Sequence, residues 1–309
     1  MSESGESQLG SWLSPEADLQ PQVSERVVLE TDCEGHFKDG IKILPAFRML
    51  EQFTDQMVSS GEIPSQFHMA IGDMLPAGVN YTSRYDHISS TRKLVLHLKN
   101  GITITGESAP LELVEQSELF GPVDTSPINP DRILLDKVAI QEIIPQGPNI
   151  QFIDAVIKPH SYQPKVLAEA IHTITGDDYV RQGISDRFYF NRSRLLEGLG
   201  QLAYIHFREN IKTAKPMTPF FEKVDGYFTK YQPQIGETIH YQLNHFEVDF
   251  TDRGDKGSGI ISGLVMDGHG TLVIAKFTAT VGAAEPRRLE KIAGLAHRQS
   301  LKSTPPEQI

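Results

Sequence analysis

The stretch HFKDGIKILP, residues 36–45, places His36 four residues before Gly40 and nine residues before Pro45. Imidazole is the side chain that most readily accepts and gives a proton near neutral pH. Glycine permits a tight turn, and proline suits the first turn of a helix, where its missing N–H costs no hydrogen bond. The stretch therefore predicts a base beside a helix N-terminus, where backbone N–H groups stabilise a carbonyl or an oxyanion.

Two helices with broad apolar faces are predicted. The first follows Pro45, with apolar residues at helical spacing up to Gly61, and the second covers residues 192–209. The second helix carries Glu197 and Gln201 four residues apart, so both lie on one helix face. Leucines flank Glu197, and desolvation by an apolar surface raises a carboxyl pKa toward neutrality. Glu197 is thus a candidate proton donor, and Gln201 is a candidate hydrogen-bond partner that orients it.

Strand-like segments surround both predicted helices. The clearest is a hairpin, residues 93–99 and 102–106, because the Asn-Gly pair between them suits a type I′ turn. Further strands are predicted over residues 23–30, 111–114, 133–144, 150–157, 166–174, 236–250, 259–266 and 271–281. A sheet curled around each apolar helix would bury that helix on most sides.

An α+β protein of two similar units is therefore expected. The predicted divisions are a disordered segment 1–22, a first unit 23–122, a second unit 130–283 and a C-terminal tail 284–309, with a proline-rich linker at 122–130.

Composition excludes several classes of function. The 309 residues carry a formal charge of −11, which disfavours nucleic acid as a partner. A single cysteine, Cys33, excludes an intramolecular disulfide and disfavours a cysteine zinc site. No apolar run is long enough to span a bilayer, and the first residues lack a signal-peptide pattern. We expect a cytoplasmic protein that does not enter a membrane.

The two helix-associated motifs resemble those of a known family. HFKDGIKILP matches the His-x-x-x-Gly-x-x-x-x-Pro motif of polyketide-synthase dehydratase domains. LLEGLGQ, residues 195–201, resembles the Leu-Leu-Asp-x-x-x-Gln motif of their second half. It is also similar to the Glu-x-x-x-Gln helix of the discrete β-hydroxyacyl-ACP dehydratases of fatty-acid synthesis. The resemblance implies a double hotdog, two antiparallel sheets each wrapped around a central helix.

The resemblance also implies one composite site. His36 of the first half would meet Glu197 of the second half. Glu51 stands at the acid position of the first helix, but residues 186–191 (DRFYFN) replace the histidine motif of the second half. The reciprocal site is therefore expected to be silent. Two further departures are Ala46, where the family usually has glycine, and Glu197, where the fused enzymes usually have aspartate.

The implied reaction is elimination of water from a β-hydroxyacyl thioester, a hydro-lyase step in polyketide or specialised fatty-acid biosynthesis. His36 would remove the α-proton and Glu197, held by Gln201, would protonate the leaving hydroxyl. Backbone N–H groups near Gly40 and Ala46 would polarise the thioester carbonyl. The resemblance implies no metal or redox cofactor, a substrate carried by an acyl carrier protein or coenzyme A, and a monomeric pseudo-dimer or a homodimer.

Two alternatives stay open, since one fold serves several reactions. A product-template cyclase or a double-bond isomerase would use a similar histidine–acid pair on the same scaffold. A degenerate hotdog could instead bind an acyl chain or a carrier protein without catalysis.

Overall fold

The structure is a computed structural model, and it describes residues 21–33, 42–72, 74–88, 91–97, 101–115, 119, 129–159, 165–182, 186–213, 216–251, 254, 256–291 and 294. His36 and Gly40 lie outside the described residues, as do nearly all of the predicted disordered segment and most of the predicted linker. Pro45, Ala46, Glu197 and Gln201 lie within them.

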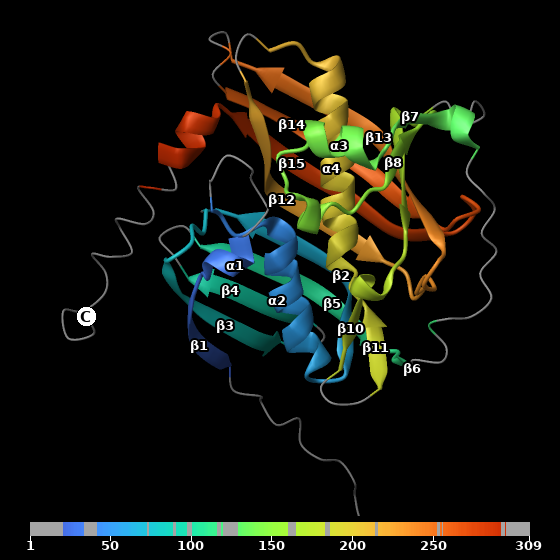
Figure 1. Cartoon of the computed structure of the whole chain (residues 1–309). Coiled ribbons are helices and arrows are strands. Elements are labelled where there is room, and N and C mark those ends of the chain that lie inside the picture. Colours follow the sequence, from blue (N-terminus) through green and yellow to red (C-terminus); the bar gives the residue numbers. More distant parts are fainter. Residues whose placement is uncertain are drawn as a thin grey trace, which may run out of the picture.

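One twelve-stranded antiparallel sheet runs through both halves of the chain (Figure 1). Its order is β1-β3-β4-β5-β2-β12-β15-β14-β13-β9-β8-β7. The first half supplies β1 (Gln22–Val27), β2 (Glu62–Ile71), β3 (Asn80–Ile88), β4 (Thr91–His97) and β5 (Ile102–Pro110). The second half supplies β7 (Ile133–Leu135), β8 (Ala155–Ile157), β9 (Ala168–Thr173), β12 (Thr218–Phe228), β13 (Thr238–Phe250), β14 (Lys256–Met266) and β15 (Val273–Ala284).

The halves join where β2 pairs with β12, from Lys223 opposite Ala70 to Tyr227 opposite Gln66. A separate three-stranded sheet contains β6 (Val114–Glu115), β10 (Tyr179–Arg181) and β11 (Arg187–Phe190). The predicted hairpin is confirmed as β4 paired with β5, with Leu96 opposite Ile102, and Gly101 before β5 has a positive φ of 69°.

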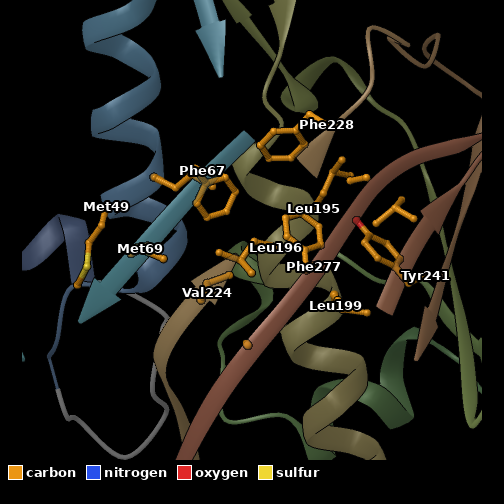
Figure 2. Packing of buried hydrophobic residues seen from close by; sticks show 14 of the residues in the cluster. Met49, Phe67, Met69, Leu195, Leu196, Leu199, Val224, Phe228, Tyr241 and Phe277 are labelled. Atoms are coloured by element: carbon orange, nitrogen blue, oxygen red, sulfur yellow. The ribbon is translucent and has the colours of Figure 1, made fainter. Parts of the chain in front are cut away.

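Each half packs a central helix, α2 (Ala46–Val58) or α4 (Ser193–Asn210), against its strands. Figure 2 shows the packing around the start of α4, where Leu195, Leu196 and Leu199 lie among side chains of β2, β12, β13 and β15. Both predicted helices are confirmed, as is the expected α+β architecture of two antiparallel units that each hold a helix. Pro45 itself is the cap residue before α2 (φ −72°, ψ 154°), one position earlier than predicted.

The strand predicted over residues 133–144 is wrong beyond Leu135. Asp136 caps a helix, α3 (Lys137–Ile143), because its Oδ1 accepts a hydrogen bond from the N–H of Ala139 at 2.9 Å. Residues 150–157 form a strand only at β8, after a 3₁₀ turn, η2 (Pro148–Ile150). Other short turns are α1 (Glu30–Cys33), η1 (Pro130–Arg132) and η3 (Gly176–Asp178). The predicted first strand stops at Val27, and residues 111–113 lie outside any strand.

Residues 286–291, which fall in the predicted C-terminal tail, form a helical turn. Leu289 is only 1% exposed and packs with Ile43 of the first half and Ala284 of β15. This segment therefore helps to enclose the space between the halves. No helix within the described part of the chain is long and apolar enough to cross a membrane.

Candidate active site

A cavity of about 470 Å³ is lined by residues from both halves. The first half contributes Ile43 to Ala46, Met49 and the end of β2, and the second half contributes residues of α4, β12, β13, β14 and β15. Most of the lining is apolar, including Phe207, Phe220, Phe246 and Ile261. Such a cavity suits a hydrocarbon chain with a few polar groups near one place.

Glu197 lies on the wall of this cavity and is 3% exposed. Its Oε1 accepts a hydrogen bond from Nε2 of Gln146 at 2.9 Å, and no cationic side chain among the described residues forms an ion pair with it. Burial raises the pKa of Glu197 to about 7, although the amides of Gln201 and Gln146 act in the opposite direction. A carboxyl whose pKa is raised toward neutrality in this way can hold a proton and give it up close to neutral pH.

Gln201 is fully buried one helical turn beyond Glu197. Its Nε2 donates to the carbonyl of Ile150, and its Oε1 accepts from the N–H of Phe152 at 3.0 Å. Both contacts tie α4 to residues 150–152, so Gln201 fixes the wall beside the acid. A further amide, Nε2 of Gln146, donates to the Glu197 carboxylate at 2.9 Å. Sequence reasoning missed Gln146, and the only available signal was a polar side chain between two prolines, Pro145 and Pro148.

Pro45 and Ala46 line the same cavity, so the N-terminus of α2 opens toward it. The N-terminus of a helix presents N–H groups without intrahelical partners and a partial positive charge. A carbonyl placed there would be polarised. Of the predicted site residues, Pro45 and Ala46 of the first half and Glu197 of the second half line one cavity. His36 and Gly40 lie outside the described residues.

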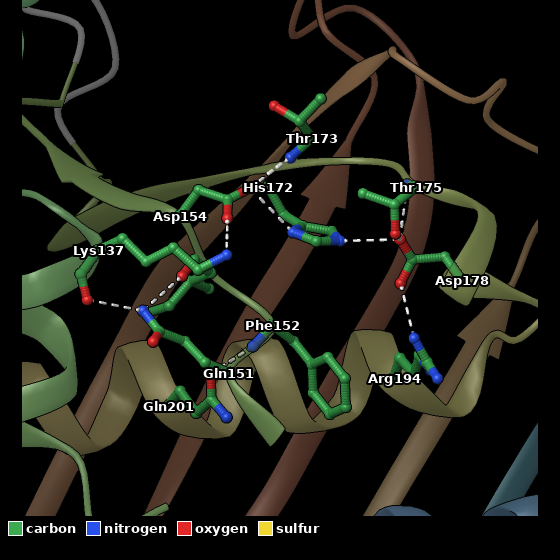
Figure 3. A network of polar contacts seen from close by, with 11 residues as sticks. Lys137, Gln151, Phe152, Asp154, His172, Thr173, Thr175, Asp178, Arg194 and Gln201 are labelled. Atoms are coloured by element: carbon green, nitrogen blue, oxygen red, sulfur yellow. Dashed lines mark hydrogen bonds and ion pairs between the residues drawn. The ribbon is translucent and has the colours of Figure 1, made fainter. Parts of the chain in front are cut away.

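A charged network supports the wall that holds Gln201 (Figure 3). The His172 ring bonds Asp154 and Asp178 at 3.1 Å each, and Asp178 also contacts Arg194 of α4 at 3.3 Å. Burial alone would lower the pKa of His172, but the two carboxylates raise it to about 9. The imidazolium therefore links the start of α4 to the segment that follows Phe152.

The carboxylates of α2 have different surroundings. Glu51 forms an ion pair with Arg48 at 2.7 Å and accepts a hydrogen bond from Nδ2 of Asn191 at 2.7 Å. Asp55 accepts a hydrogen bond from the Tyr189 hydroxyl at 3.2 Å, and burial raises the pKa of Asp55. The reciprocal position is thus occupied by side chains of the protein itself.

No family model and no curated protein sequence matches the chain. Among solved structures it is similar to an N-terminal dehydratase from the difficidin assembly line, with a TM-score of 0.56 and 13% identity over 91% of this chain and 99% of that chain. It is also similar to a trans-AT PKS dehydratase domain from Brevibacillus brevis, with a TM-score of 0.50 and 13% identity over 86% and 93% of the two chains. The chain has the double-hotdog fold.

A structure provisionally named a thioesterase, from Novosphingobium aromaticivorans, has a similar fold, with a TM-score of 0.52 and 9% identity over 84% of this chain and 94% of that chain. Its likeness shows that the double hotdog alone does not decide between elimination of water and hydrolysis of a thioester. The described residues contain no group of three or more His, Cys, Asp or Glu side chains arranged to hold a metal ion. The choice of reaction therefore depends on the residues of the cavity.

Proposed function

We propose that this protein is a hydro-lyase that eliminates water from a β-hydroxyacyl thioester. The observation that carries the proposal is the composite cavity, in which a buried carboxyl of the second half faces the same space as the helix start of the first half. A carboxyl with a pKa of about 7 suits a general acid at neutral pH. The motif order and the double-hotdog dehydratase structures provide independent support.

The proposed reaction divides its proton transfers between the two halves. His36 removes the proton on the α-carbon, and the electron pair forms the new double bond as the bond from the β-carbon to oxygen breaks. Glu197 gives its proton to the departing hydroxyl, so the leaving group is water. The N-terminus of α2 near Ala46 stabilises the negative charge that develops on the thioester carbonyl. The α-carbon is formally oxidised and the β-carbon is formally reduced by the same amount, so the step needs no external oxidant or reductant.

The apolar lining supports an acyl chain as the substrate body. Phe207, Phe246 and Val248 lie on the same cavity as Glu197, so a chain attached to the β-carbon can extend along the wall from α4 to β13. We propose that the thioester is carried on the phosphopantetheine arm of an acyl carrier protein or on coenzyme A. The corresponding pathways are polyketide synthesis or specialised fatty-acid synthesis.

The direct test incubates the full chain with 3-hydroxyacyl pantetheine thioesters of several chain lengths. Mass spectrometry should detect the enoyl thioester, lighter by one water, and a thiol reagent should detect no release of free pantetheine. His36→Ala and Glu197→Gln should both abolish formation of the enoyl product. Release of thiol without the enoyl product would establish hydrolysis instead, and turnover that is unchanged in His36→Ala would exclude the proposed base.

A panel of enoyl and polyketone thioesters separates the proposed reaction from those of the same-scaffold alternatives. Migration of a double bond or ring closure, without loss of water from the hydroxyacyl substrates, would identify an isomerase or a cyclase. Binding of acyl pantetheine without any turnover would identify a non-catalytic scaffold.

A further inference from the structure

Gln146 is a second polar group in the cavity besides Glu197, and it is only 7% exposed. One end of its amide is used, because Nε2 donates to Oε1 of Glu197 at 2.9 Å. The other end is not used: within the described part of the chain, Oε1 of Gln146 is a buried acceptor without a hydrogen-bond partner. A buried amide oxygen without a partner loses the hydrogen bonds that water would give it, so native proteins seldom retain one.

The backbone fixes this side chain independently of α4. Gln146 lies between Pro145 and the Gly147–Pro148 start of η2, and its carbonyl accepts a hydrogen bond from Nε2 of Gln141 at 2.7 Å. Ile144, two residues earlier, is buried in the main core. These contacts hold the backbone of Gln146 in place beside the cavity, so the side chain that carries the unpaired oxygen starts from a fixed point in the cavity wall.

We propose that Gln146 binds the β-hydroxyl group of the substrate and selects for it. The amide oxygen accepts the hydroxyl hydrogen while the amide N–H of the same side chain holds Glu197. This inference rests on the proposed function, since it names the substrate group that occupies the free acceptor. Of the groups on a β-hydroxyacyl thioester that reach the acid, the hydroxyl is the donor.

The arrangement sets the direction of the proton transfer. When the hydroxyl hydrogen points to Gln146, the oxygen lone pairs are left for the proton of Glu197. After the transfer and the break of the carbon–oxygen bond, the departing water keeps its hydrogen bond to Gln146. The new carboxylate keeps the hydrogen bond that it receives from the Gln146 N–H. Gln146 therefore contacts both the leaving group and the acid throughout the step.

A site that hydrogen-bonds a substrate hydroxyl discriminates against analogues that lack it, because its own polar group is then left unpaired. The test uses pantetheine thioesters of one chain length that carry two methyl groups on the α-carbon. Without an α-proton these ligands cannot eliminate water, so equilibrium binding can be measured with the active protein. Three ligands are compared by calorimetry: a 3-hydroxy form, a 3-oxo form that accepts but cannot donate, and a form without oxygen at the β-carbon.

The wild-type protein should bind the 3-hydroxy ligand about tenfold more tightly than either of the other two. Gln146→Met keeps the length of the side chain but removes both amide functions, and its preference should fall to within about twofold. Gln232→Met is the matched control. Gln232 is not among the residues that line the cavity, its Nε2 donates to the carbonyl of Glu112 at 2.8 Å, and its Oε1 accepts from the N–H of Phe190 at 3.4 Å, so this variant should keep the tenfold preference.

Two results would overturn the inference: equal binding of the 3-hydroxy and 3-oxo ligands by the wild-type protein, or an unchanged preference in Gln146→Met. Equal binding by the wild-type protein overturns the inference even if Gln146→Met does not fold, whereas the variant is needed to assign a preference to Gln146, because the Glu197 carboxylate can also accept from a hydroxyl. If the wild-type protein binds none of the three ligands and turns over no hydroxyacyl thioester, the proposed function itself fails. Turnover without the tenfold preference would leave the proposed function intact and remove only the role of Gln146.

Discussion

The central helices of the two halves carry carboxylates near their first turns, and the two carboxylates have opposite surroundings. Glu197 of α4 lies in an apolar cavity, bonded by the amide of Gln146 and without a cationic partner among the described residues. Glu51 of α2 is paired with Arg48 and bonded by Asn191. The same scaffold thus holds one carboxyl that can exchange a proton and one that serves as a fixed anion.

The surroundings of Glu197 and Glu51 differ because different residues of the opposite half of the chain lie beside each helix. The first half brings the start of α2 to Glu197 and leaves space beside it. The second half brings the segment from Tyr189 to Asn191 to α2, where it occupies the hydrogen-bonding positions of Glu51 and Asp55. The fusion of two similar units therefore permits one site to remain open while the other becomes part of the interface. These contacts support the expectation that the reciprocal site is silent.

The largest expected effect separates the two carboxylates by activity. Glu197→Gln should lower kcat for elimination by about a thousandfold, because a positioned general acid contributes about 10²–10⁴ in rate. Glu51→Gln, the matched change on the other helix, should leave kcat within about threefold of the wild-type value. Steady-state formation of the enoyl thioester measures both variants. A similar decrease in kcat in both variants would contradict the assignment of Glu197 to an active site and Glu51 to an inactive one.

The charged network beside Gln201 should give the next largest effect. His172→Gln leaves Asp154 and Asp178 without their shared cation, and removal of one partner of a buried charge pair costs about 3–5 kcal/mol. Because the folded-state pKa of about 9 lies above the ordinary value of 6.5, the contribution of His172 is complete below about pH 6.5 and is lost as the pH rises through about 9.

Urea unfolding of both proteins between pH 6 and pH 10 measures this contribution. The difference in the free energy of unfolding between the wild-type protein and His172→Gln should shrink toward pH 10. A difference that stays constant across this range would show that the imidazole stabilises the second half by packing and not by its charge. In that case the charge of His172 would not stabilise the wall beside Glu197.

Local sequence signals were sufficient for the elements that carry the site. The proline before α2 and the apolar faces of α2 and α4 act within one or two helical turns, so both helices could be placed from the sequence. Residues 133–144 (ILLDKVAIQEII) have no such unique interpretation, because short apolar runs of this kind fit a strand or a buried helix equally well. Asp136, whose side chain caps α3, contained the deciding signal.

Long-range pairing was the part that the sequence could not supply. The central strand β12 carries charged residues and Gly226 in its middle, and it is defined by its partners β2 and β15 more than by its own alternation. The same limit applies to the site. Glu197 belongs to a recognisable motif, whereas Gln146 reaches it from 51 positions earlier through a loop whose path depends on the whole second half.

The ionisation of Glu197 should also make the stability of the protein depend on pH. The folded-state pKa of Glu197, about 7, lies above the ordinary value of 4.5. Between these values the native state binds a proton that the unfolded chain has released, so the free energy of unfolding falls as the pH rises from about 4.5 to 7. Glu197→Gln removes the cost of ionising a buried carboxyl. The variant should therefore be more stable than the wild-type protein at pH 8 by about 2 kcal/mol, after allowance for a weaker hydrogen bond from Gln146.

Chemical denaturation of Glu197→Gln at pH 5 and pH 8 measures this gain, which should be much smaller at pH 5. Equal gains at the two pH values would mean that the carboxyl of the folded protein titrates in its ordinary range. Glu197 would then be ionised at neutral pH, and the contrast with Glu51 would rest on access to the cavity alone.

The smallest expected effect belongs to Glu51. Glu51→Gln should destabilise the protein by about 1 kcal/mol, because Arg48 is 42% exposed and solvent screens its pair with Glu51. The hydrogen bond from Asn191 can be retained by the amide oxygen of the new glutamine, so the cost reflects the charge only. A double-mutant cycle with Arg48→Met isolates that term, and their coupling should decline when salt is raised from 0.05 to about 1 M. A coupling that is large and independent of salt would place Glu51 in a dry, enclosed environment like that of Glu197, and Glu51 would then need to be tested as a second acid.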